Sequence, residues 1–453
     1  MIKILPTIGP ASDSINSLRK ILKFTNTIRL NGSHNNIAWH IRVSSNIKKI
    51  DPNCKILIDI PGVKPRTENS DNITISKNQK IIFFFKTKPR VLKKNNKVIF
   101  IKISRSLPKF SNVKFFSVSD GKYIFKFSKQ GKNFIEGISL QNFILSPRKG
   151  LNVPGSLYSN KEQVNLYLSF IKKIKKVKFD AIGLSFIQDE KVLRILRKKF
   201  PKLSLVSKIE NLNGMMNLNK ITENSDIIMI DRGDLSAEIG DIKLFDAIIT
   251  ISKTCRFFGK PLIMATENLE TMISNSMPSK SEIVSLAFSN QIKTDLIMLS
   301  DETATSRNYL KILAWLKKFI NSLNSKNINS NRKNLNEDIF NNVFQNLKDA
   351  SLVIFTKKGY IINKILKISD NVKFYIFSDN KKIINQSFFR ANCEAFLTKK
   401  FPKNMEEFIH SYIKKNKNII FNKAFNIFLT YVNYPRKKSR ANTLSLINKA
   451  SFI

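Results

Sequence analysis

The sequence predicts an α/β protein built on a (β/α)8 TIM barrel, with an inserted small β-barrel domain and a C-terminal α/β domain. Short apolar runs alternate with helical stretches along most of the 453 residues, a pattern typical of parallel sheets. Between residues 69 and 151, strand-like runs instead follow one another without a helix, which indicates the inserted domain. Polar residues gather where the apolar runs end, and barrels of this class carry their active sites at that face.

The barrel is predicted from eight short apolar runs, each short enough for one strand. A helical stretch between residues 14 and 24 separates the first two runs, and further helical stretches follow the later ones. This many strand–helix units imply a closed parallel barrel. The runs are Met1–Ile8, Thr27–Leu30, Ile56–Asp59, Ala181–Phe186, Leu203–Ile209, Ile227–Ile230, Pro261–Ala265 and Asp295–Leu299.

Changes in pattern set the expected domain boundaries. We expect the barrel to comprise residues 1–68 and 152–322, and the inserted β domain, a lid, to comprise residues 69–151. A polar stretch at residues 323–335 is predicted to be a linker. Residues 336–453 then form a smaller α/β domain, with strands near residues 352–355, 373–377 and 428–432.

The net charge of +45 ordinarily suggests a nucleic-acid partner. Here lysine is spread over every segment, and it accompanies an excess of Asn, Ile and Phe, whose codons are also A/T-rich. We therefore expect nucleic-acid binding to be at most non-specific. No apolar run is long enough to cross a bilayer, no signal-peptide pattern is present, and the three cysteines are widely spaced. A cytoplasmic protein is expected.

The segment Ser207–Asn211 and the segment Asp231–Asp234 carry the strongest chemical signal. On a strand, Lys208 and Glu210 point to the same face. Glu210 and Asp234 then share a divalent cation, and carboxylate oxygens suit Mg²⁺. A lysine beside such an ion fits phosphoryl transfer, which positioned positive charge stabilises. The alternative is a solvated ion pair at a strand end.

The order of motifs resembles the pyruvate kinase family over nearly the whole chain. Each motif alone is weak, but nine of them occur in the family's order, with the β insertion at the expected place. The C-terminal domain matches only loosely. The motifs are Thr7–Ser12, Arg29–His34, Asp59–Thr67, Lys149–Gly155, Ser185–Phe186, Ser207–Asn211, Arg232–Leu235, Ala265–Thr266 and Leu299–Ala304.

The resemblance implies transfer of the phosphoryl group of phosphoenolpyruvate to ADP, which yields pyruvate and ATP. Glu210 and Asp234 would hold Mg²⁺, and Lys208 would stabilise the transferred group. The backbone amides of Gly233 and Asp234 would receive the substrate carboxylate. The family also implies a homotetramer.

Thr266 is implied to lie beside the carbon that becomes protonated, with Ser300 in the same relay. The implied phosphate and nucleotide contacts are four basic residues: Arg29, Arg66, His34 and Lys149. Each assignment has a structural alternative. Thr266 and His34 can cap helices, the two arginines can form rim salt bridges, and Lys149 lies in a chain rich in lysine.

Lys64 replaces a glutamate that potassium-dependent members of the family carry. Asn31, Ser33, Asp59 and the carbonyl of Ile60 match the family's potassium ligands. The Lys64 ammonium would supply the charge that potassium otherwise brings, so we expect potassium to be dispensable. The alternative is that biased composition placed this lysine.

Other departures from the family predict a slower or less tightly regulated enzyme. Asp231 stands where the family has alanine, which places an added charge near the substrate carboxylate. The loop 356–360 keeps one hydroxyl and one glycine of a phosphate-binding effector loop, so we expect sugar-phosphate activation to be lost. Further departures are Glu267, Asn268, Lys280 and Asp301.

Two other functions remain open from the sequence. One is a carbon–carbon lyase of the phosphoenolpyruvate/pyruvate barrel type, although the β insertion and the Arg29–His34 motif, which serve a nucleotide in the family, argue against it. The other is a non-enzymatic basic binding protein on a decayed scaffold. Retention of Lys208, Glu210, Asp234 and Thr266 argues against decay.

Overall fold

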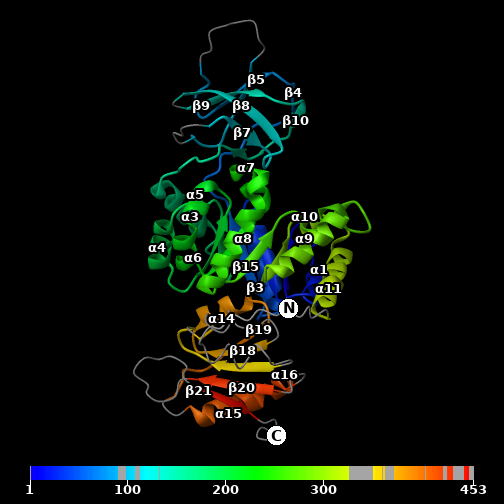
Figure 1. Cartoon of the computed structure of the whole chain (residues 1–453), viewed down its shortest axis with the longest axis vertical. Coiled ribbons are helices and arrows are strands. Elements are labelled where there is room, and N and C mark those ends of the chain that lie inside the picture. Colours follow the sequence, from blue (N-terminus) through cyan, green and yellow to red (C-terminus); the bar gives the residue numbers. More distant parts are fainter. Residues whose placement is uncertain are drawn as a thin grey trace.

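Three regions lie one beyond another along the long axis of the molecule (Figure 1). The barrel is in the middle, the inserted strands lie beyond one end, and the C-terminal sheet lies beyond the other. The computed structural model describes residues 2–89, 98–107, 113–131, 133–325, 350–359, 361–362, 372–402, 405–421, 426–431 and 443–447. Within these ranges, no helix is both long and apolar enough to cross a membrane.

Eight parallel strands close into a barrel, which confirms the predicted fold class. Each strand pairs with its neighbours around the ring, and β16 pairs with β1 to close it. The strands are β1 (Lys3–Ile8), β2 (Thr27–Asn31), β3 (Lys55–Ile60), β12 (Ala181–Leu184), β13 (Ser204–Ile209), β14 (Ile227–Asp231), β15 (Leu262–Ala265) and β16 (Leu296–Leu299).

Helices follow the strands and surround the barrel. Several begin at a side-chain cap that satisfies a free amide of the first turn, and Ser279 forms a full capping box with Glu282. The helices are α1 (Ile15–Ile21), α2 (Ile37–Ile50), α3 (Asn160–Lys173), α4 (Glu190–Lys199), α5 (Leu212–Met216), α6 (Leu218–Asn224), α7 (Arg232–Ile239), α8 (Asp241–Phe258), η1 (Glu270–Ile273), α9 (Lys280–Gln291), α10 (Asp301–Ala304) and α11 (Tyr309–Ser325).

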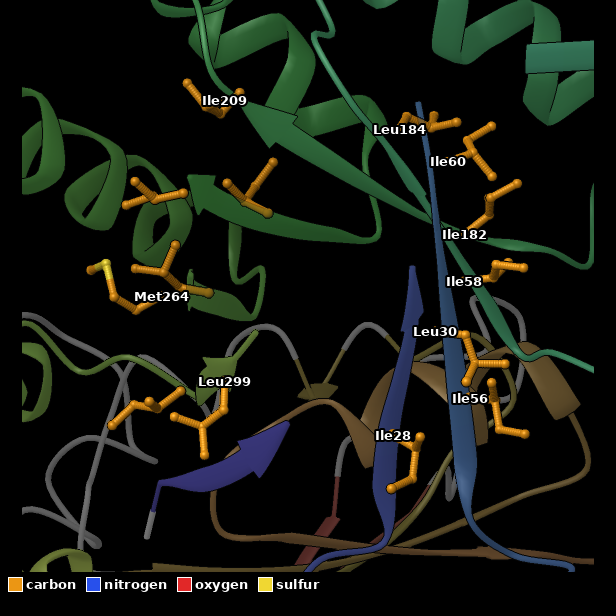
Figure 2. Close-up of a cluster of buried hydrophobic side chains, with 14 of the residues drawn as sticks. Ile28, Leu30, Ile56, Ile58, Ile60, Ile182, Leu184, Ile209, Met264 and Leu299 are labelled. Atoms are coloured by element: carbon orange, nitrogen blue, oxygen red, sulfur yellow. The ribbon is translucent and has the colours of Figure 1, made fainter. Parts of the chain in front are cut away.

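Strand alternation divides the barrel residues into two sets. The first set faces the helices and forms the large core between strands and helices. Figure 2 shows part of it, with Ile28 and Leu30 on β2 and Ile56, Ile58 and Ile60 on β3. Because alternate residues of each strand serve this core, the intervening residues face the barrel interior.

The barrel interior is apolar toward the amino ends of its strands. A separate buried cluster, which begins at these ends and reaches the last residue of β15, contains Leu5, Leu57, Ala181, Val206, Ile227, Met229, Ile263, Ala265, Leu296, Met298 and Phe389. All but Phe389 come from barrel strands. Phe389 belongs to the C-terminal region, is completely buried, and fills this end of the barrel as a plug.

The inserted region contains a six-stranded sheet and a two-stranded sheet. Its core packs Phe83, Phe116 and Phe125 against one another, with ring centroids 5.1 to 5.9 Å apart. The strands are β4 (Ile73–Ile75), β5 (Lys80–Phe84), β6 (Ile99–Lys102), β7 (Phe115–Val118), β8 (Tyr123–Gly131), β9 (Phe134–Ser139), β10 (Phe143–Leu145) and β11 (Leu151–Asn152).

The C-terminal region forms a five-stranded sheet in the order β19-β18-β17-β20-β21. The sequence predicted β17, β18 and β20 and missed β19 and β21. Three predicted features lie outside the described residues: the linker beyond residue 325, the end of the third predicted strand at Val432, and Tyr360 of the candidate effector loop. The elements are β17 (Ala350–Phe355), β18 (Val372–Ser378), α14 (Lys381–Phe388), β19 (Cys393–Leu397), α15 (Glu406–Lys415), α16 (Lys417–Ile420), β20 (Asn426–Tyr431) and β21 (Thr443–Ile447).

Hydrogen bonds tie the C-terminal region to the amino end of the barrel. Lys3 Nζ donates to the carbonyls of Phe388 and Cys393 at 2.9 and 3.0 Å. The Ala391 amide donates to Asp295, and Gln386 donates to Asp226 at 2.7 Å. These contacts surround the Phe389 plug, so this end of the barrel is closed and its other end is left for a site.

Candidate active site

The inward-facing residues change from apolar to charged toward the carboxyl ends of the strands. Asp59 is on β3, Lys208 is on β13, and Asp231 ends β14. All three side chains are buried, with at most 12% of each exposed. Charges held this far from water keep fixed positions, and an active site requires this.

Lys208 lies among three carboxylates. Its Nζ is 2.7 Å from Glu210, 3.3 Å from Asp59 and 3.3 Å from Asp231. Burial alone lowers the pKa of this ammonium, but the three carboxylates outweigh burial and raise the pKa well above its ordinary value. Lys208 is therefore a permanent cation at the centre of the site.

Arg29 fixes the position of Asp59. Its Nη2 and Nε donate to one oxygen of Asp59 at 2.8 and 3.2 Å, and its Nη1 donates to Thr7 at 2.9 Å. Burial raises the pKa of Asp59, but Lys208 and Arg29 more than offset it, so the pKa lies below its ordinary value. Asp59 is thus ionised and paired with two cations.

Glu210, Asp231 and Asp234 bring one carboxylate oxygen each to within 4.8 Å of one another. Burial raises the pKa of Glu210 to about 8, and Asp231 and Asp234 raise it against the lowering effect of Lys208. Burial likewise raises the pKa of Asp234 to about 6. Three converging hard oxygens that the protein does not fully neutralise fit a divalent cation such as Mg²⁺.

Lys64 links this group to the inserted region. Its ammonium forms ion pairs with Asp234 and, at 2.8 Å, with Asp120 on the turn between β7 and β8. The lysine side chain runs across Gly150, where any Cβ would lie only 2.3 Å from it. Burial lowers the pKa of Lys64, but Asp234 and Asp120 outweigh burial and raise it. The inserted region therefore touches the site through a buried cation.

Thr266 occupies a strained backbone position directly after β15. Its φ of 59° is unusual for a β-branched residue, and such strain is concentrated at functional sites. Thr266 Oγ1 accepts from the Arg232 amide at 3.1 Å and lies 3.3 Å from Asp231. The hydroxyl is thus held between β14 and the start of α7.

The first turn of α7 faces the same group of residues. Asp231 occupies the N-cap position, but its side chain makes no capping hydrogen bond. The Gly233 amide donates weakly to Thr266 at 3.4 Å, and Asp234 follows it in the same turn. Amides of a first turn have no acceptor within their own helix and attract anions.

An exposed basic rim beside this group comprises four residues: His34, Arg66, Arg148 and Lys149. Partial burial and the nearby Arg66 guanidinium lower the pKa of His34, and Arg29 and Arg148 lower it further. Arg66 donates to the Arg148 carbonyl at 3.2 Å. His34 and Arg66 are both exposed, so this rim is open to a phosphate-bearing ligand. Lys149 is exposed on the adjoining segment.

Other predicted site residues show fewer links to the centre. The Ser300 amide donates to Glu302 at 2.5 Å. Among the described residues, the Ser300 hydroxyl forms no hydrogen bond with Thr266. In the predicted potassium pocket, Asn31 Oδ1 accepts from the Ser33 amide at 3.1 Å. The β2–β3 register places Asn31 beside Asp59, and Ile60 ends β3.

The departures at residues 267 and 268 have structural roles. Asn268 is fully buried and accepts from Arg232 at 2.8 Å, while its amide donates to carbonyls of β15 and β16. Glu267 is half exposed and lies 3.8 Å from Arg232. These two residues therefore support the Arg232 side chain beneath α7.

Sequence reasoning missed Asp120 and Ser185. Asp120 lies in a turn where Ser119, Asp120 and Gly121 all have positive φ, and the Asp-Gly pair was the available signal for a turn. Ser185 directly follows β12, and its hydroxyl lies 3.3 Å from both Asp59 and Lys208. Only the fold shows that these two residues reach the site.

Comparison with known proteins shows the family. The model of the pyruvate kinase barrel domain matches residues 1–311. The chain is 29% identical to pyruvate kinase of Thermococcus litoralis over 67% of this chain and 66% of that protein, just under two thirds of its length. It is 27% identical to pyruvate kinase of Buchnera aphidicola over 84% of this chain and 85% of the relative. It is 29% identical to pyruvate kinase of Thermotoga maritima over 70% of this chain. The chain belongs to the pyruvate kinase family.

Proposed function

We propose that this chain transfers the phosphoryl group of phosphoenolpyruvate to ADP and protonates the remaining enolate, which yields pyruvate and ATP. The observation that carries this proposal is the permanent cation Lys208, buried between Glu210, Asp59 and Asp231 at the carboxyl end of the barrel. Family membership supports a kinase of this kind.

Lys208 stabilises the transferred group. The bond between phosphorus and the enol oxygen breaks while a bond to a terminal oxygen of ADP forms, and negative charge spreads over the phosphoryl oxygens. A fixed ammonium in a site shielded from water stabilises such charge without reorganising. Arg29 holds Asp59, and Asp59 in turn helps to hold Lys208.

The start of α7 binds the substrate carboxylate. The amides of Gly233 and Asp234 lie in the first turn, where the helix dipole favours an anion. Thr266 bonds to the same turn, so its hydroxyl is next to any carboxylate bound there. In this position Thr266 delivers the proton to the enolate carbon, directly or through an ordered water, with Ser300 in the same relay.

Glu210 and Asp234 are the proposed ligands for Mg²⁺. Their oxygens converge within 4.8 Å, and the hard carboxylate donors fit this ion. When bound, Mg²⁺ supplies charge that anchors and polarises the phosphate and carboxylate of the substrate. The open rim around Arg66, His34 and Lys149 binds the nucleotide phosphates.

Lys64 makes potassium dispensable in this proposal. It is a buried cation beside Asp234, and Asp59 of the matching potassium pocket is already paired with Arg29 and Lys208. In the described part of the chain, Lys64 pairs with Asp234 and Asp120 and not with Asp59. Lys64 therefore adds positive charge to the whole active site and not to the potassium pocket alone. The same proposal includes a homotetramer without sugar-phosphate activation.

The test is a turnover assay on the purified full-length chain. Phosphoenolpyruvate, ADP and Mg²⁺ are supplied in a tetramethylammonium buffer, and pyruvate is measured before and after potassium is added. We expect pyruvate to form at nearly the same rate in both. A rate that depends fully on potassium contradicts the role of Lys64, and no pyruvate in either buffer contradicts the proposed reaction.

A further inference from the structure

We propose that Asp231 is a third carboxylate ligand of the divalent ion, and that it strengthens binding of the ion to the substrate-free chain. The inference rests on the metal site of the proposed function but goes beyond it, because that site has two protein carboxylates, Glu210 and Asp234. Mg²⁺ sites commonly use one or two carboxylates and complete the shell with water and substrate.

Strand register places Asp231 beside Glu210. The β13–β14 pairing matches Lys208 with Met229 and Ile209 with Ile230. Glu210 and Asp231 come next on the two strands, and alternation turns both side chains into the barrel. The position of Asp231 thus follows from the barrel geometry and does not depend on a loop.

The contacts of Asp231 confirm that its side chain points toward the charged centre. One oxygen is 3.3 Å from Lys208 Nζ, and the other accepts from Thr266 at 3.3 Å. As the N-cap of α7, its side chain bonds to none of that helix's amides. One of its oxygens lies within 4.8 Å of carboxylate oxygens of Glu210 and Asp234.

With Asp231 counted, the charge balance of the site matches one divalent cation. Five carboxylates meet three cations in the connected ion-pair group: Asp59, Asp120, Glu210, Asp231 and Asp234 against Arg29, Lys64 and Lys208. With every group ionised, two negative charges remain, which one divalent ion offsets. Without Asp231 a single negative charge remains.

Asp231 also affects the affinity for the ion in the absence of substrate. A third carboxylate strengthens the ion's binding without substrate, and it lies beside the amides proposed for the substrate carboxylate. The bound ion then offsets the repulsion that Asp231 exerts on the substrate.

The experiment measures Mn²⁺ and Mg²⁺ binding to the substrate-free, full-length protein. Free Mn²⁺ is followed by its electron paramagnetic resonance signal, and Mg²⁺ is added as a competitor. Asp231→Ala is compared with wild type and with Asp246→Ala, which removes one exposed carboxylate of α8. Asp231→Asn keeps the shape of the side chain, and it replaces Asp231→Ala if that variant unfolds at a lower temperature.

We expect Asp231→Ala to weaken Mn²⁺ binding at least about tenfold, while Asp246→Ala matches wild type. Equal affinity in wild type and in the folded Asp231 variant overturns the proposal, and so does an equal loss in Asp246→Ala. Because no turnover is measured, the result does not depend on the proposed reaction. A chain that makes no pyruvate but shows the tenfold difference refutes the reaction and supports the metal ligand.

Discussion

The two ends of the barrel interior have the same strand geometry but opposite chemistry. At the amino end, inward-facing residues such as Leu57, Val206 and Ile227 pack around the fully buried Phe389. Two positions further along β3 and β13, Asp59 and Lys208 meet in a charged group. The amino end stabilises the fold, and the carboxyl end is left to bind a ligand, as expected for barrels of this class.

The two ends also treat buried carboxylates differently. At the amino end, Asp226 pairs with Arg197 and Lys382 and accepts from the Leu205 amide at 2.8 Å. Asp180 lies 2.7 Å from Lys48. At the carboxyl end, Glu210, Asp231 and Asp234 outnumber their cations. A charge that is fully paired supports structure, whereas a group with excess charge attracts a ligand.

Replacing one lysine at each end tests this difference most strongly. Lys208→Ala removes the central cation, and we expect kcat to fall by roughly 10³-fold or more because the fixed positive charge that stabilises the transferred group is lost. Turnover and thermal unfolding are measured together.

Lys260→Ala is the matched control at the amino end. Lys260 donates to the carbonyls of Ser225 and Glu223, so its loss lowers stability, and it leaves kcat within about twofold because this end of a barrel does not carry the active site. Equal losses of kcat in the two variants would remove the distinction between the ends.

Phe389→Ala tests the plug at the amino end. Emptying a fully buried phenylalanine site costs about 3–5 kcal/mol of unfolding free energy, measured by urea denaturation. Phe388→Ala is the neighbouring control, because Phe388 is only partly buried and lies under the Lys55 ammonium at 4.8 Å. If both variants lose the same small amount, Phe389 does not hold the barrel closed.

Glu238 tests how the carboxyl end handles a buried acid. Burial raises its pKa to about 8, while the unfolded chain restores an ordinary value near 4.5. The folded state therefore binds the extra proton between about pH 5 and 8, and unfolding free energy falls as pH rises, by at most about 1.4 kcal/mol per pH unit. Glu238→Gln should flatten this slope, as measured by denaturation at several pH values. An unchanged slope in the variant would assign the pH dependence to other groups.

Asp120→Ala gives the smallest expected effect. Asp120 is largely exposed, and exposed ion pairs contribute about 0–1 kcal/mol. Losing its contact with Lys64 should lower kcat/KM by no more than about fivefold, because Lys64 keeps its second ion pair, with Asp234. Asp71→Ala in the same region serves as the control. A loss above a hundredfold would place Asp120 in the chemistry itself.

Local sequence patterns predicted most of the barrel, because strand alternation is a local property. All eight strands were found, and spacing of two residues correctly placed Lys208 beside Glu210, which lie 2.7 Å apart. The identity of the residues at the strand ends then indicated the chemistry.

Contacts between distant segments were not predictable in this way. Asp120 and Asp234 are 114 positions apart along the chain, yet both pair with Lys64. Nothing in the turn that carries Asp120 indicates this contact. Insertion of Phe389 into the barrel, likewise, depends on how the C-terminal region docks. The direction of the Asp231 side chain could be predicted only with the β13–β14 register, and the sequence alone does not give that register.

The most direct test of the central claim quantifies pyruvate and ATP in the same reaction with phosphoenolpyruvate, ADP and Mg²⁺. A phosphoryl transfer site built around Lys208 predicts equal amounts of both products from the wild-type chain and neither above background from Lys208→Ala. Pyruvate without ATP, or equal product from the Lys208 variant, would contradict the account.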